Sequence, residues 1–595
     1  MKKPNEKKQI LKSMLNGIGL SILTFYAIEF IQRLALPQTI AYPEIPLVVL
    51  GSLVLLILYL FFRALTNSNL IASGLLFFLS ISLAIASRIK YSFRAEPLYP
   101  HELRFATEIS FLIEMMGWPA AILILLTIVL GTIGIILFYR KKIKPKKKKR
   151  ASKQFRRIRV LTLIVTLLSL ISIGRFNQLG NPIRKLYRMH MSNPHQRSMT
   201  VYFENGLIAG FLNHLNAPPM ETPVNYSKEN IQEIVEKYQA VAEEWNADLE
   251  ETLANVNVLF VMNESFADPM NLEGIDANKD PLPYFRSLAD ATLSGQVLSS
   301  TYGGGTDANE FMALTGFSME PLAAHYTTPY EQLDERTEHY PNLLHKLKAL
   351  DYQATAIHPY DPTFFNRETV YQQMKFDQFL HEETMEHQEK ASEDHLYISD
   401  ASVYKEAFSV LNEIDKPDFI HMVTMQNHTP YDTKYTDIEY EVTGTGNEEE
   451  ASGYFTDLES SDEALQALID QIDNHPEPIL LLFWGDHLPG LYSEQVRIKN
   501  PAHKLQETPF LLYSNTEDLK SEYDWISPMY FSVLINEYLQ LEISPYEALL
   551  KELHKNLPAF EKGMYYNKET ETFDPSRDDL NQEVTDRLDE YTMIL

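Results

Sequence analysis

The chain contains no cysteine among its 595 residues. Disulfide bonds and thiolate metal ligands are therefore excluded, and an exported domain must be large enough to be stable without such cross-links. Positive charge is also scarce, because 52 lysines and arginines stand against 80 aspartates and glutamates, a net charge of −28 at pH 7. This acidic balance argues against nucleic acid as a partner.

Charged residues are rare in the first third of the chain, which contains five apolar stretches. Each is close to the ~20 residues with which a helix crosses a bilayer. The stretches cover roughly residues 14–36, 45–65, 70–92, 118–139 and 159–176. Glu29, Gln32 and Arg33 interrupt the outer end of the first, as expected of interfacial residues. No signal-peptide cleavage site follows it closely, so we interpret it as an anchor. The sequence predicts a five-helix transmembrane domain over residues 1–176.

Basic residues are concentrated in two segments that flank these stretches. Four lysines lie among residues 2–8, and residues 140–150 are almost entirely lysine and arginine. The positive-inside rule assigns both segments to the cytoplasm. Five spans then place residues 177–595 outside. We therefore expect a multi-pass protein of the cell membrane with a cytoplasmic N-terminus and an extracellular region over residues 177–595.

From about residue 255 onward, short apolar runs alternate with helical stretches. This pattern is typical of a mostly parallel sheet that is covered by helices on both faces. The expected strands are residues 256–262, 352–357, 419–425, 479–484 and 508–513. Polar residues follow several of these runs. Open α/β sheets bind ligands at the edge where the carboxyl ends of their strands meet.

Four polar side chains stand out at this expected edge. Glu264 follows the first run, and Asp486 and His487 follow the fourth. Thr306 follows three consecutive glycines. Two carboxylates, an imidazole and a hydroxyl can hold one divalent cation and offer it an oxygen nucleophile.

Each of the four has an alternative role when it is considered singly. Glu264 and Thr306 are suitable helix caps, and Asp486 with His487 suits a turn. Their joint occurrence after strands favours a metal-assisted transferase or hydrolase. The oxygen and nitrogen donor set suits Mn²⁺ and does not exclude Zn²⁺.

Three further parts complete the predicted organisation. Residues 177–250 are expected to be an extracellular helical linker whose basic stretch, residues 184–188, either lies against lipid head groups or forms an ordinary surface helix. Residues 251–555 are expected to form the extracellular catalytic domain. Residues 556–595 are acidic and show no core-forming periodicity, so we expect a C-terminal tail on the surface.

The chain resembles the lipoteichoic acid synthases, membrane-anchored members of the sulfatase and alkaline-phosphatase superfamily from Gram-positive bacteria. The motifs that carry the resemblance are Asn263-Glu264-Ser265-Phe266, Gly305-Thr306 and Gly485-Asp486-His487. The resemblance covers nearly the whole length and implies a sulfatase-like α/β domain after the spans. It also implies that Thr306 is the catalytic nucleophile and that Glu264, Thr306, Asp486 and His487 bind the metal, with Mn²⁺ expected and Mg²⁺ next.

The resemblance implies a set of substrate contacts as well. His358, Phe365 and Arg367 match the segment that binds a glycerol-phosphate head group, although the family usually has tryptophan at the position of Phe365. His428, in Asn427-His428-Thr429-Pro430, matches a second head-group histidine. An ion pair of Arg367 with Asp361 or Glu368 is the alternative, since such pairs are common.

The identity of the nucleophile distinguishes two chemistries within this superfamily. A sulfatase requires a cysteine or serine that is oxidised to formylglycine, and a threonine cannot be converted in that way. A threonine hydroxyl needs a Lewis acid to act as a nucleophile at neutral pH. A phosphodiester is therefore a better substrate than a sulfate ester.

We expect transfer of glycerol phosphate from phosphatidylglycerol to a growing lipoteichoic acid chain. The transfer would pass through a covalent threonine intermediate and release diacylglycerol. A lipoteichoic acid primase, or a glycerol-phosphate transferase that acts on another surface glycan, is the alternative within this chemistry. A glycolipid or lipoteichoic acid would be the acceptor. An inactive sulfatase-like sensor or scaffold is the alternative of a different class.

Overall fold

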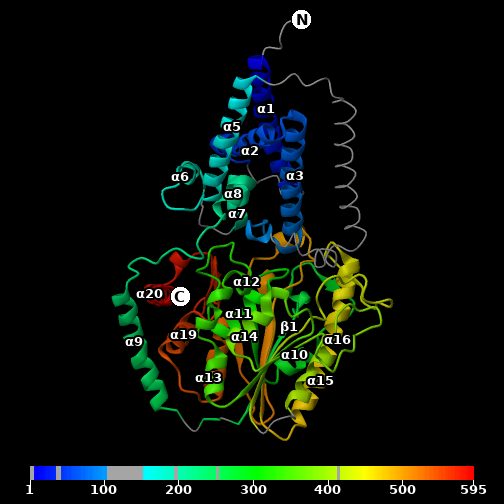
Figure 1. The fold of residues 1–595 in the computed structure, drawn as a ribbon. Coiled ribbons are helices and arrows are strands. Elements are labelled where there is room, and N and C mark those ends of the chain that lie inside the picture. The colour runs from blue at the N-terminus through cyan, green and yellow to red at the C-terminus, as the bar shows by residue number, and fades with distance from the viewer. Residues whose placement is uncertain are drawn as a thin grey trace. The chain divides into compact units, whose positions relative to one another are not determined.

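The computed structural model describes residues 6–34, 42–103, 152–192, 198–249, 252–253, 255–411 and 416–595. The chain forms two compact units (Figure 1). The first consists of Met1–Pro219 with Ala323–His325, and the second of Met220–Leu322 with Tyr326–Leu595. The apolar stretch predicted over residues 118–139 and the basic segment 140–150 lie outside the described residues.

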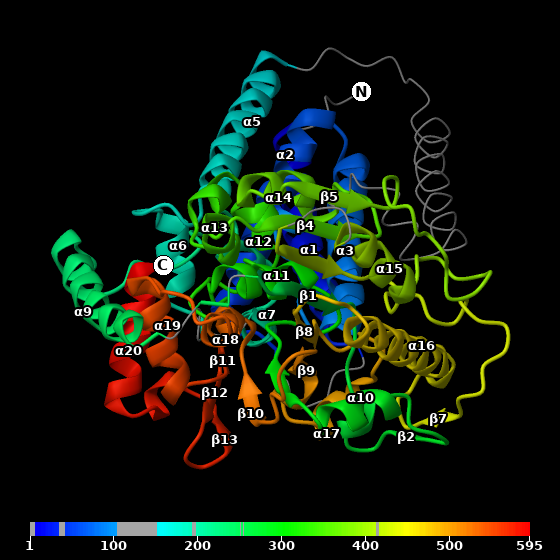
Figure 2. The same ribbon diagram turned by 90° about the horizontal axis from the view of Figure 1, so that it is seen from below.

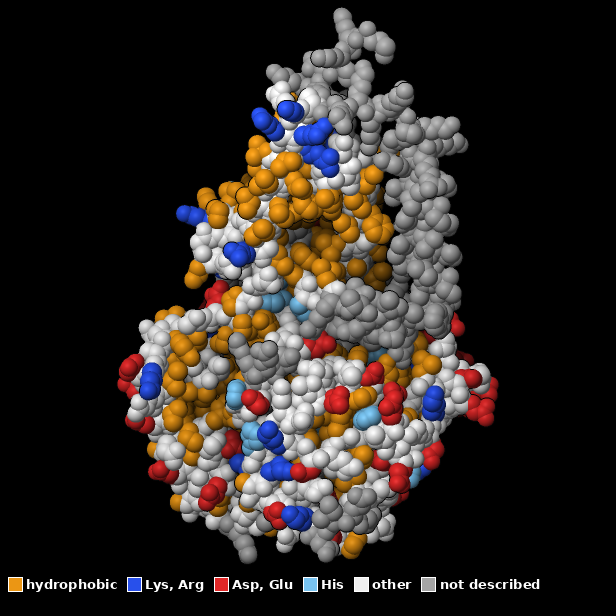
Figure 3. All heavy atoms as spheres, in the orientation of Figure 1, with side chains coloured by type: hydrophobic (Ala, Val, Ile, Leu, Met, Phe, Trp, Pro, Cys, Tyr) orange, Lys and Arg blue, Asp and Glu red, His pale blue; other side chains and the backbone are white. Residues whose placement is uncertain are grey.

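Long apolar helices dominate the first unit. They are α1 (Glu6–Gln32), α2 (Ile45–Thr66), α3 (Asn69–Arg94) and α5 (Lys153–Gly174). Within the described residues, these four are long and apolar enough to cross a membrane. Many of their hydrophobic side chains are exposed on the molecular surface (Figure 3), as expected of helices that a bilayer covers. Four of the five predicted stretches are therefore confirmed as helices.

The polar residues near the C-terminal end of α1 make internal contacts. The buried Glu29 forms an ion pair with Arg33 and accepts a hydrogen bond of 2.9 Å from the backbone N–H of Leu207. Gln32 donates a hydrogen bond of 2.6 Å to the carbonyl of Ala84. These bonds join α1 to α3 and to α8 (Leu207–Asn213), which follows α7 (Ser198–Asn205).

An eight-stranded sheet forms the centre of the second unit, in the order β10-β3-β9-β8-β1-β6-β4-β5. The strands are β1 (Asn257–Asn263), β3 (Leu293–Leu298), β4 (Gln353–His358), β5 (Gln378–His381), β6 (Asp418–Val423), β8 (Ile479–Gly485), β9 (Glu507–Ser514) and β10 (Glu522–Ile526). β9 pairs antiparallel with β3 and β8, and all other pairs in this sheet are parallel. The mostly parallel α/β fold expected from the sequence is confirmed.

Helices cover both faces of this sheet (Figure 2). On one face lie α11 (Thr306–Thr315), α13 (Leu343–Ala349), α14 (Arg367–Met374), α18 (Phe531–Tyr538) and α19 (Pro545–Asn556). On the other lie α10 (Pro283–Ala289), α15 (Asp400–Leu411) and α16 (Glu448–Asp473). All seven residues of β1 are buried, since a central strand between two helical layers has no solvent-facing side. Smaller elements are α12 (Pro329–Gln332), α17 (Glu494–Lys499) and the paired strands β2 (Asp276–Ala277) and β7 (Val442–Thr443).

The C-terminal residues pack into the core, so the prediction of a surface tail over 556–595 is wrong. They form β11 (Phe560–Glu561), β12 (Met564–Asn567), β13 (Thr572–Asp574) and α20 (Gln582–Ile594). Leu588 and Tyr591 of α20 are buried in the main core, and the Tyr591 hydroxyl donates a 3.0 Å hydrogen bond to the carbonyl of Gly316. Three acidic side chains of α20, Glu583, Asp586 and Asp589, are exposed, and they hide this short apolar repeat in the sequence.

The expected linker over residues 177–250 is divided between the two units. Its first part, to Pro219, belongs to the first unit. Helix α9 (Lys228–Ala247) belongs to the second, where Tyr238 is buried and donates a 2.7 Å hydrogen bond to Glu590 of α20. Trp245 donates to the carbonyl of Leu541. The four-part division at residues 176, 250 and 555 stays a prediction.

Candidate active site

The parallel pairing of β1 and β8 determines where two acidic residues emerge. Asn263, the last residue of β1, lies opposite Gly485, the last residue of β8. Glu264 and Asp486 therefore leave the sheet side by side. A Cβ on Gly485 would lie 1.7 Å from the carbonyl oxygen of Phe266. Glycine is required there because the chain beyond Glu264 passes directly over the end of β8.

The turn after β1 is held in a strained conformation. Ser265 has a φ of 49°, a left-handed conformation that costs a non-glycine residue about 1 kcal/mol or more. Its backbone N–H donates a 2.7 Å hydrogen bond to Asp486 Oδ1, and its hydroxyl donates a 2.9 Å bond to Glu264 Oε1. Ser265 thus holds both carboxylates, a role that the sequence motif contained but did not reveal.

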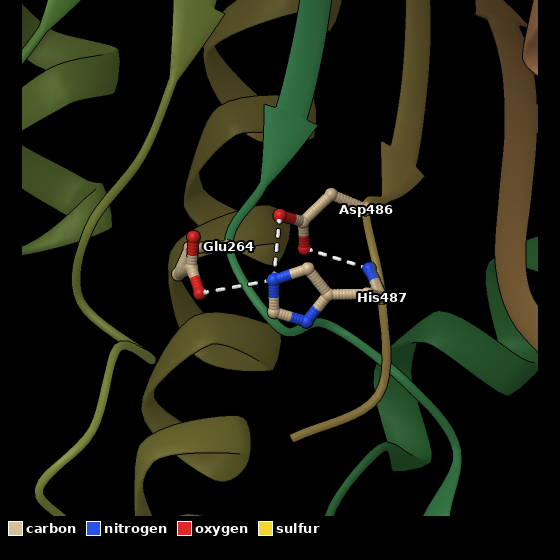
Figure 4. A group of neighbouring side chains, drawn as sticks. All are labelled: Glu264, Asp486 and His487. Atoms are coloured by element: carbon tan, nitrogen blue, oxygen red, sulfur yellow. Dashed lines mark hydrogen bonds and ion pairs between the residues drawn. The ribbon is translucent and has the colours of Figure 1, made fainter. Parts of the chain in front are cut away.

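Three potential metal ligands meet at this edge of the sheet (Figure 4). Glu264, Asp486 and His487 are all buried, and one ligand atom from each lies within 4.8 Å of the others. His487 Nε2 is 3.7 Å from Glu264 Oε1 and 3.3 Å from Asp486 Oδ2. The sequence prediction that these strand-end residues come together agrees with the geometry.

The predicted nucleophile lies beside the same cluster. Gly303, Gly304 and Gly305 have φ values of 67°, 126° and 93°, which explains the run of glycines before Thr306. Thr306 is the first residue of α11, where backbone N–H groups and the helix dipole favour negative charge. Its Oγ1 donates a 3.2 Å hydrogen bond to Glu264 Oε2 and lies 3.5 Å from His487 Nε2.

The donor atoms are arranged as a metal site requires. His487 Nδ1 lies 3.0 Å from the carbonyl of Leu488, so this nitrogen carries the proton and Nε2 presents its lone pair to the cluster. Asp486 Oδ1 accepts hydrogen bonds from two backbone N–H groups, of Ser265 and His487, whereas Oδ2 has no hydrogen-bond partner. An oxygen and a nitrogen lone pair are thus directed into one buried space.

The charge balance of the cluster also favours a cation. Burial, together with the negative charge of Glu264, raises the pKa of Asp486 to about 7. For Glu264 burial acts in the same upward direction, but the electrostatic influence of His487 and His428 lowers its pKa overall. Two adjacent buried carboxylates are costly without a positive partner. The residues present therefore fit a divalent cation held by oxygen and nitrogen donors.

Arg367 is bound to an acid that the sequence alternatives did not include. Its guanidinium is fully buried, and Nε and Nη2 donate hydrogen bonds of 3.1 and 3.0 Å to Glu310 Oε2. Asp361 and Glu368, the partners considered from the sequence, do not fill this role. Glu310 also accepts hydrogen bonds from the hydroxyl of Tyr371 and, at 3.2 Å, from His421.

His358 belongs to the same network. Its Nδ1 donates to the carbonyl of Val423 at 2.9 Å, so Nε2 accepts a hydrogen bond of 3.1 Å from Arg367 Nη1. Burial and the charge of Arg367 lower the pKa of His358 well below its usual value, which keeps the ring neutral. The bonds to Glu310 and His358 use three of the five N–H donors of Arg367.

Phe365 lies beside Arg367 in a strained turn. Phe365 and Asn366 both have positive φ values, of 55° and 59°. The Arg367 guanidinium is 5.3 Å from the centre of the Phe365 ring, within cation–π range. The centres of the Phe364 and Phe365 rings are 4.3 Å apart. Two consecutive strained residues indicate a constrained loop rather than a simple helix start.

His428 lies beyond the end of β6 and interacts electrostatically with Glu264. Its Nδ1 is 2.8 Å from the Thr429 carbonyl and 3.0 Å from the Tyr397 hydroxyl, which itself donates to that carbonyl at 2.9 Å. Because a carbonyl only accepts, Nδ1 carries the proton and Nε2 keeps a lone pair. Burial lowers the pKa of His428, which favours this neutral form.

A buried ion pair supports the loop that carries His428. Lys434 is fully buried and donates hydrogen bonds of 2.6 Å to the carbonyl of Gln426 and 2.5 Å to Asp457 of α16. Asp457 also accepts from Tyr435 at 2.7 Å and contacts His395 at 3.0 Å. The sequence offered no signal for Lys434, Asp457 or Tyr397, because their partners are distant in the chain. For Glu310 there was such a signal, because this charged residue directly precedes the apolar run Phe311-Met312-Ala313-Leu314.

Comparison with known proteins relates the central part of the second unit to a family. Residues 256–532 match the sulfatase family. This part of the chain is a sulfatase-family domain. The matched region begins at β1 and ends in α18, so it contains Glu264, Thr306, Asp486 and His487.

Three relatives extend this result. The putative cyclic β-1,2-glucan modification protein of Rhizobium meliloti is 26% identical over 584 residues, covering 94% of this chain and 87% of that protein. The structure of the Streptococcus pyogenes phosphoglycerol transferase GacH in complex with sn-glycerol-1-phosphate shares 26% identity and a TM-score of 0.55, covering 63% of this chain and 94% of that one. The lipoteichoic acid synthase of Staphylococcus aureus is 23% identical over 269 residues, covering 44% of this chain.

The resemblance stated from the sequence is confirmed at the level of the sulfatase and alkaline-phosphatase superfamily, with phosphoglycerol transferase-like relatives. The match to the Staphylococcus aureus synthase covers only 39% of that protein, whereas the match to the rhizobial glucan modification protein covers most of both chains. Relatives of the whole chain therefore extend beyond lipoteichoic acid synthesis.

Proposed function

We propose that this protein is a membrane-bound phosphoglycerol transferase that takes glycerol phosphate from phosphatidylglycerol. The observation that carries the proposal is the position of Thr306, whose hydroxyl lies within 3.5 Å of both Glu264 and His487 at the N-terminus of α11. Two further observations support the proposal. A relative is a phosphoglycerol transferase in complex with sn-glycerol-1-phosphate. Four apolar helices of this chain would keep the site near lipid.

Glu264, Thr306, Asp486 and His487 would hold one divalent cation, for which we propose Mn²⁺, with Mg²⁺ as the alternative. When bound, it would supply Lewis-acid stabilisation of negative charge on oxygen. In the first step the Thr306 oxygen attacks the donor phosphorus, and the bond from phosphorus to the diacylglycerol oxygen breaks. The threonine proton ends on the released diacylglycerol, and glycerol phosphate stays on Thr306.

In the second step a hydroxyl of the acceptor attacks the same phosphorus. The bond to Thr306 breaks, the acceptor carries the new phosphodiester, and the acceptor proton returns to Thr306. The backbone N–H groups at the start of α11 favour the negative charge that develops next to Thr306. His428, with its Nε2 lone pair, is a proposed acceptor of a hydrogen bond from a glycerol hydroxyl. Phe365, His358 and Arg367 are the other proposed head-group residues.

We propose that the donor is used on the outer face of the cell membrane, with the N-terminus in the cytoplasm. The acidic composition requires that an anionic head group be bound by local features rather than by a general positive field.

The test is incubation of the full-length protein in lipid nanodiscs with labelled phosphatidylglycerol and Mn²⁺. We expect labelled diacylglycerol from the native protein and none from Thr306→Ala. Equal release by the two proteins, or none by either in the presence of acceptor and metal, would rule out the proposed reaction.

A second candidate acceptor has support of its own. A relative that matches nearly the whole chain is a putative cyclic β-1,2-glucan modification protein, which favours a single transfer to a glycan over growth of a lipoteichoic acid chain. Product length on a defined glycolipid or glucan acceptor separates these activities, since a primase or a modifying enzyme stops at one unit. The presence of Glu264, Thr306, Asp486 and His487 together argues against an inactive sensor or scaffold.

A further inference from the structure

A basic segment follows the last of the long apolar helices. We call residues 175–192 the juxtamembrane segment; it begins directly after α5 and contains α6 (Pro182–Arg188). It includes four basic residues, Arg175, Arg184, Lys185 and Arg188, and no aspartate or glutamate. The whole chain has a net charge of −28. The segment is therefore a positive site in an acidic protein.

Helix α6 has two different faces. Ile183 and Tyr187, one turn apart, pack on the core of the first unit, and the Tyr187 ring lies 5.6 Å from that of Phe176. Leu186 and Met189, the residue directly after α6, are 45% and 68% exposed. The outward face is therefore apolar, and it lies beside the exposed Lys185.

Hydrogen bonds hold α6 at the end of α5. Asn181 caps α6 by accepting from the backbone N–H groups of Ile183 and Arg184 at 2.9 and 3.2 Å. The same side chain donates to the carbonyl of Ser172, in the last turn of α5, at 2.8 Å, and to that of Arg175 at 2.9 Å. The outward face of α6 therefore has a fixed position relative to α5, and Figure 3 shows basic and hydrophobic side chains next to each other there.

We propose that the juxtamembrane segment binds the surface of the bilayer that surrounds α5. Leu179, which is 96% exposed, Leu186 and Met189 enter the boundary between acyl chains and head groups. Arg175, Arg184 and Lys185 bind the phosphates of anionic lipids there. The bilayer around α5 is continuous with this segment, because α5 exposes large apolar side chains along its length and needs lipid up to its last turn.

The charge of the segment determines which lipid it prefers. Each basic residue near an anionic surface contributes about 1 kcal/mol, which corresponds to about fivefold in binding. An anionic phosphodiester lipid is therefore favoured over a zwitterionic one. This part of the inference rests on the proposed function, since phosphatidylglycerol held here would be the donor. The segment would then raise the local concentration of donor lipid.

The absence of cysteine makes a direct test simple, because one introduced cysteine takes up all of a thiol-reactive label. Leu186→Cys and Met189→Cys are each labelled with an environment-sensitive fluorophore in the full-length protein. The proteins are placed in nanodiscs of phosphatidylcholine, with or without phosphatidylglycerol. Ile498→Cys, at a side chain that is 64% exposed on α17, is the reference for a label on the sulfatase-family domain.

We expect the labels at 186 and 189 to shift to shorter emission wavelength and to be quenched by a lipid whose spin label lies close to the head group. The Ile498 label should show neither effect. Labels at 186 and 189 that emit as they do in water, in both lipid compositions, would overturn the proposal.

A charge variant tests the preference for anionic lipid. Arg184→Gln with Lys185→Gln should retain several-fold less phosphatidylglycerol, relative to phosphatidylcholine, after detergent extraction and lipid analysis. The matched control is Lys499→Gln with Lys520→Gln, two exposed lysines of the second unit. Equal retention by both double variants would remove lipid selectivity from the segment. Thr306→Ala should leave both readouts unchanged, so failure of the proposed reaction would be seen separately.

Discussion

Glu310 and Arg367 form a buried, two-bonded ion pair one helical turn beyond Thr306. Glu310 lies four residues after Thr306 on α11, and Arg367 opens α14. The pair therefore fixes the candidate head-group arginine against the helix that carries the candidate nucleophile. Phe365 and His358 contact the same guanidinium, so one cation links three of the four predicted substrate residues.

Replacement of Arg367 by lysine should lower activity more than it lowers metal content. Lysine keeps the positive charge but cannot reproduce the planar fork that bonds Glu310 twice. We expect turnover to fall by about tenfold or more, on the order of 1.4 kcal/mol. The measurements are turnover, bound metal and melting temperature.

Lys416→Arg is the matched control, because Lys416 forms an exposed ion pair with Asp351. Such pairs contribute little to stability, so it should behave as the native protein. Native turnover in folded, metal-loaded Arg367→Lys would remove Arg367 from the site.

The ion pair of Glu310 with Arg367 should make the stability of the protein depend on pH in the acidic range. Burial alone would raise the pKa of Glu310, but the charge of Arg367 and the hydrogen bond from His421 lower it to about 2. The pKa is thus lower in the folded than in the unfolded state. The stabilisation is complete above pH of about 4.5 and is lost as pH falls from there towards 2, on the order of 3 kcal/mol in total.

Melting temperatures of the native protein and Glu310→Gln, measured between pH 7 and pH 3, test this dependence. The two curves should be far apart at pH 7 and approach each other as pH falls. Glu439→Gln, at an exposed position, should follow the native curve throughout. Parallel curves for the native protein and Glu310→Gln would contradict the assignment.

Gly485→Ala should disrupt the metal cluster. The added methyl group would meet the Phe266 carbonyl at 1.7 Å, so either β8 or the turn that carries Glu264 must move. Overpacking of this kind typically costs about 1–3 kcal/mol. We expect a lower melting temperature and substoichiometric metal. Gly19→Ala, whose Cβ would meet nothing within 4 Å, should change neither quantity.

Tyr397→Phe should impair the reaction without loss of folding. The substitution keeps the ring that packs against His428 but removes the hydroxyl that contacts His428 Nδ1 and donates to the Thr429 carbonyl. The imidazole is then less firmly oriented. We expect turnover to fall several-fold, with native metal content. Tyr513→Phe, which removes a hydroxyl bonded to the surface residue Asp473, should retain native turnover.

Metal dependence can be tested on protein purified without added ions. Manganese should be the metal that restores activity best after chelation, with magnesium second. Asp486→Asn and His487→Ala should each lower bound metal, whereas Thr306→Ala should abolish turnover while retaining metal on the remaining three ligands. Restoration by Zn²⁺ and not by Mn²⁺ would overturn the proposed cofactor.

The sequence predicts the central strands of the sheet well, because strands buried on both faces are continuous apolar runs. β1 and β8 are such strands, and their paired ends bring Glu264 and Asp486 together as expected. β3, β5 and β10 were not predicted. In β3, whose sequence is Leu-Ser-Gly-Gln-Val-Leu, only the last two residues are buried, so it has neither an apolar run nor clear alternation. The reversed direction of β9 is a property of topology that no local pattern encodes.

The residues that bond to the predicted substrate residues could not be predicted from the sequence either, because they are distant in the chain. Glu310 and Arg367 are 57 positions apart and lie on different helices. Lys434, in the loop after β6, forms a hydrogen bond with Asp457 of α16. Local patterns identify which residues are unusual, such as a charge next to an apolar run, but the pairing of buried charges depends on packing. The strand-end motifs predicted the cluster of metal ligands because the parallel pairing of β1 and β8 brings the ends of these strands together.

The packing of α9 determines where the sulfatase-family domain can be released by proteolysis. Ala240-Val241-Ala242 has the small-residue spacing of a signal-peptidase site. These residues lie inside α9, and Ala242 is buried in the core. A protease that binds an extended peptide would first have to unwind α9. Residues 217–226, which precede α9 without regular structure and include the 82% exposed Val224, present no such barrier. A protease that releases the domain intact is therefore expected to cut there.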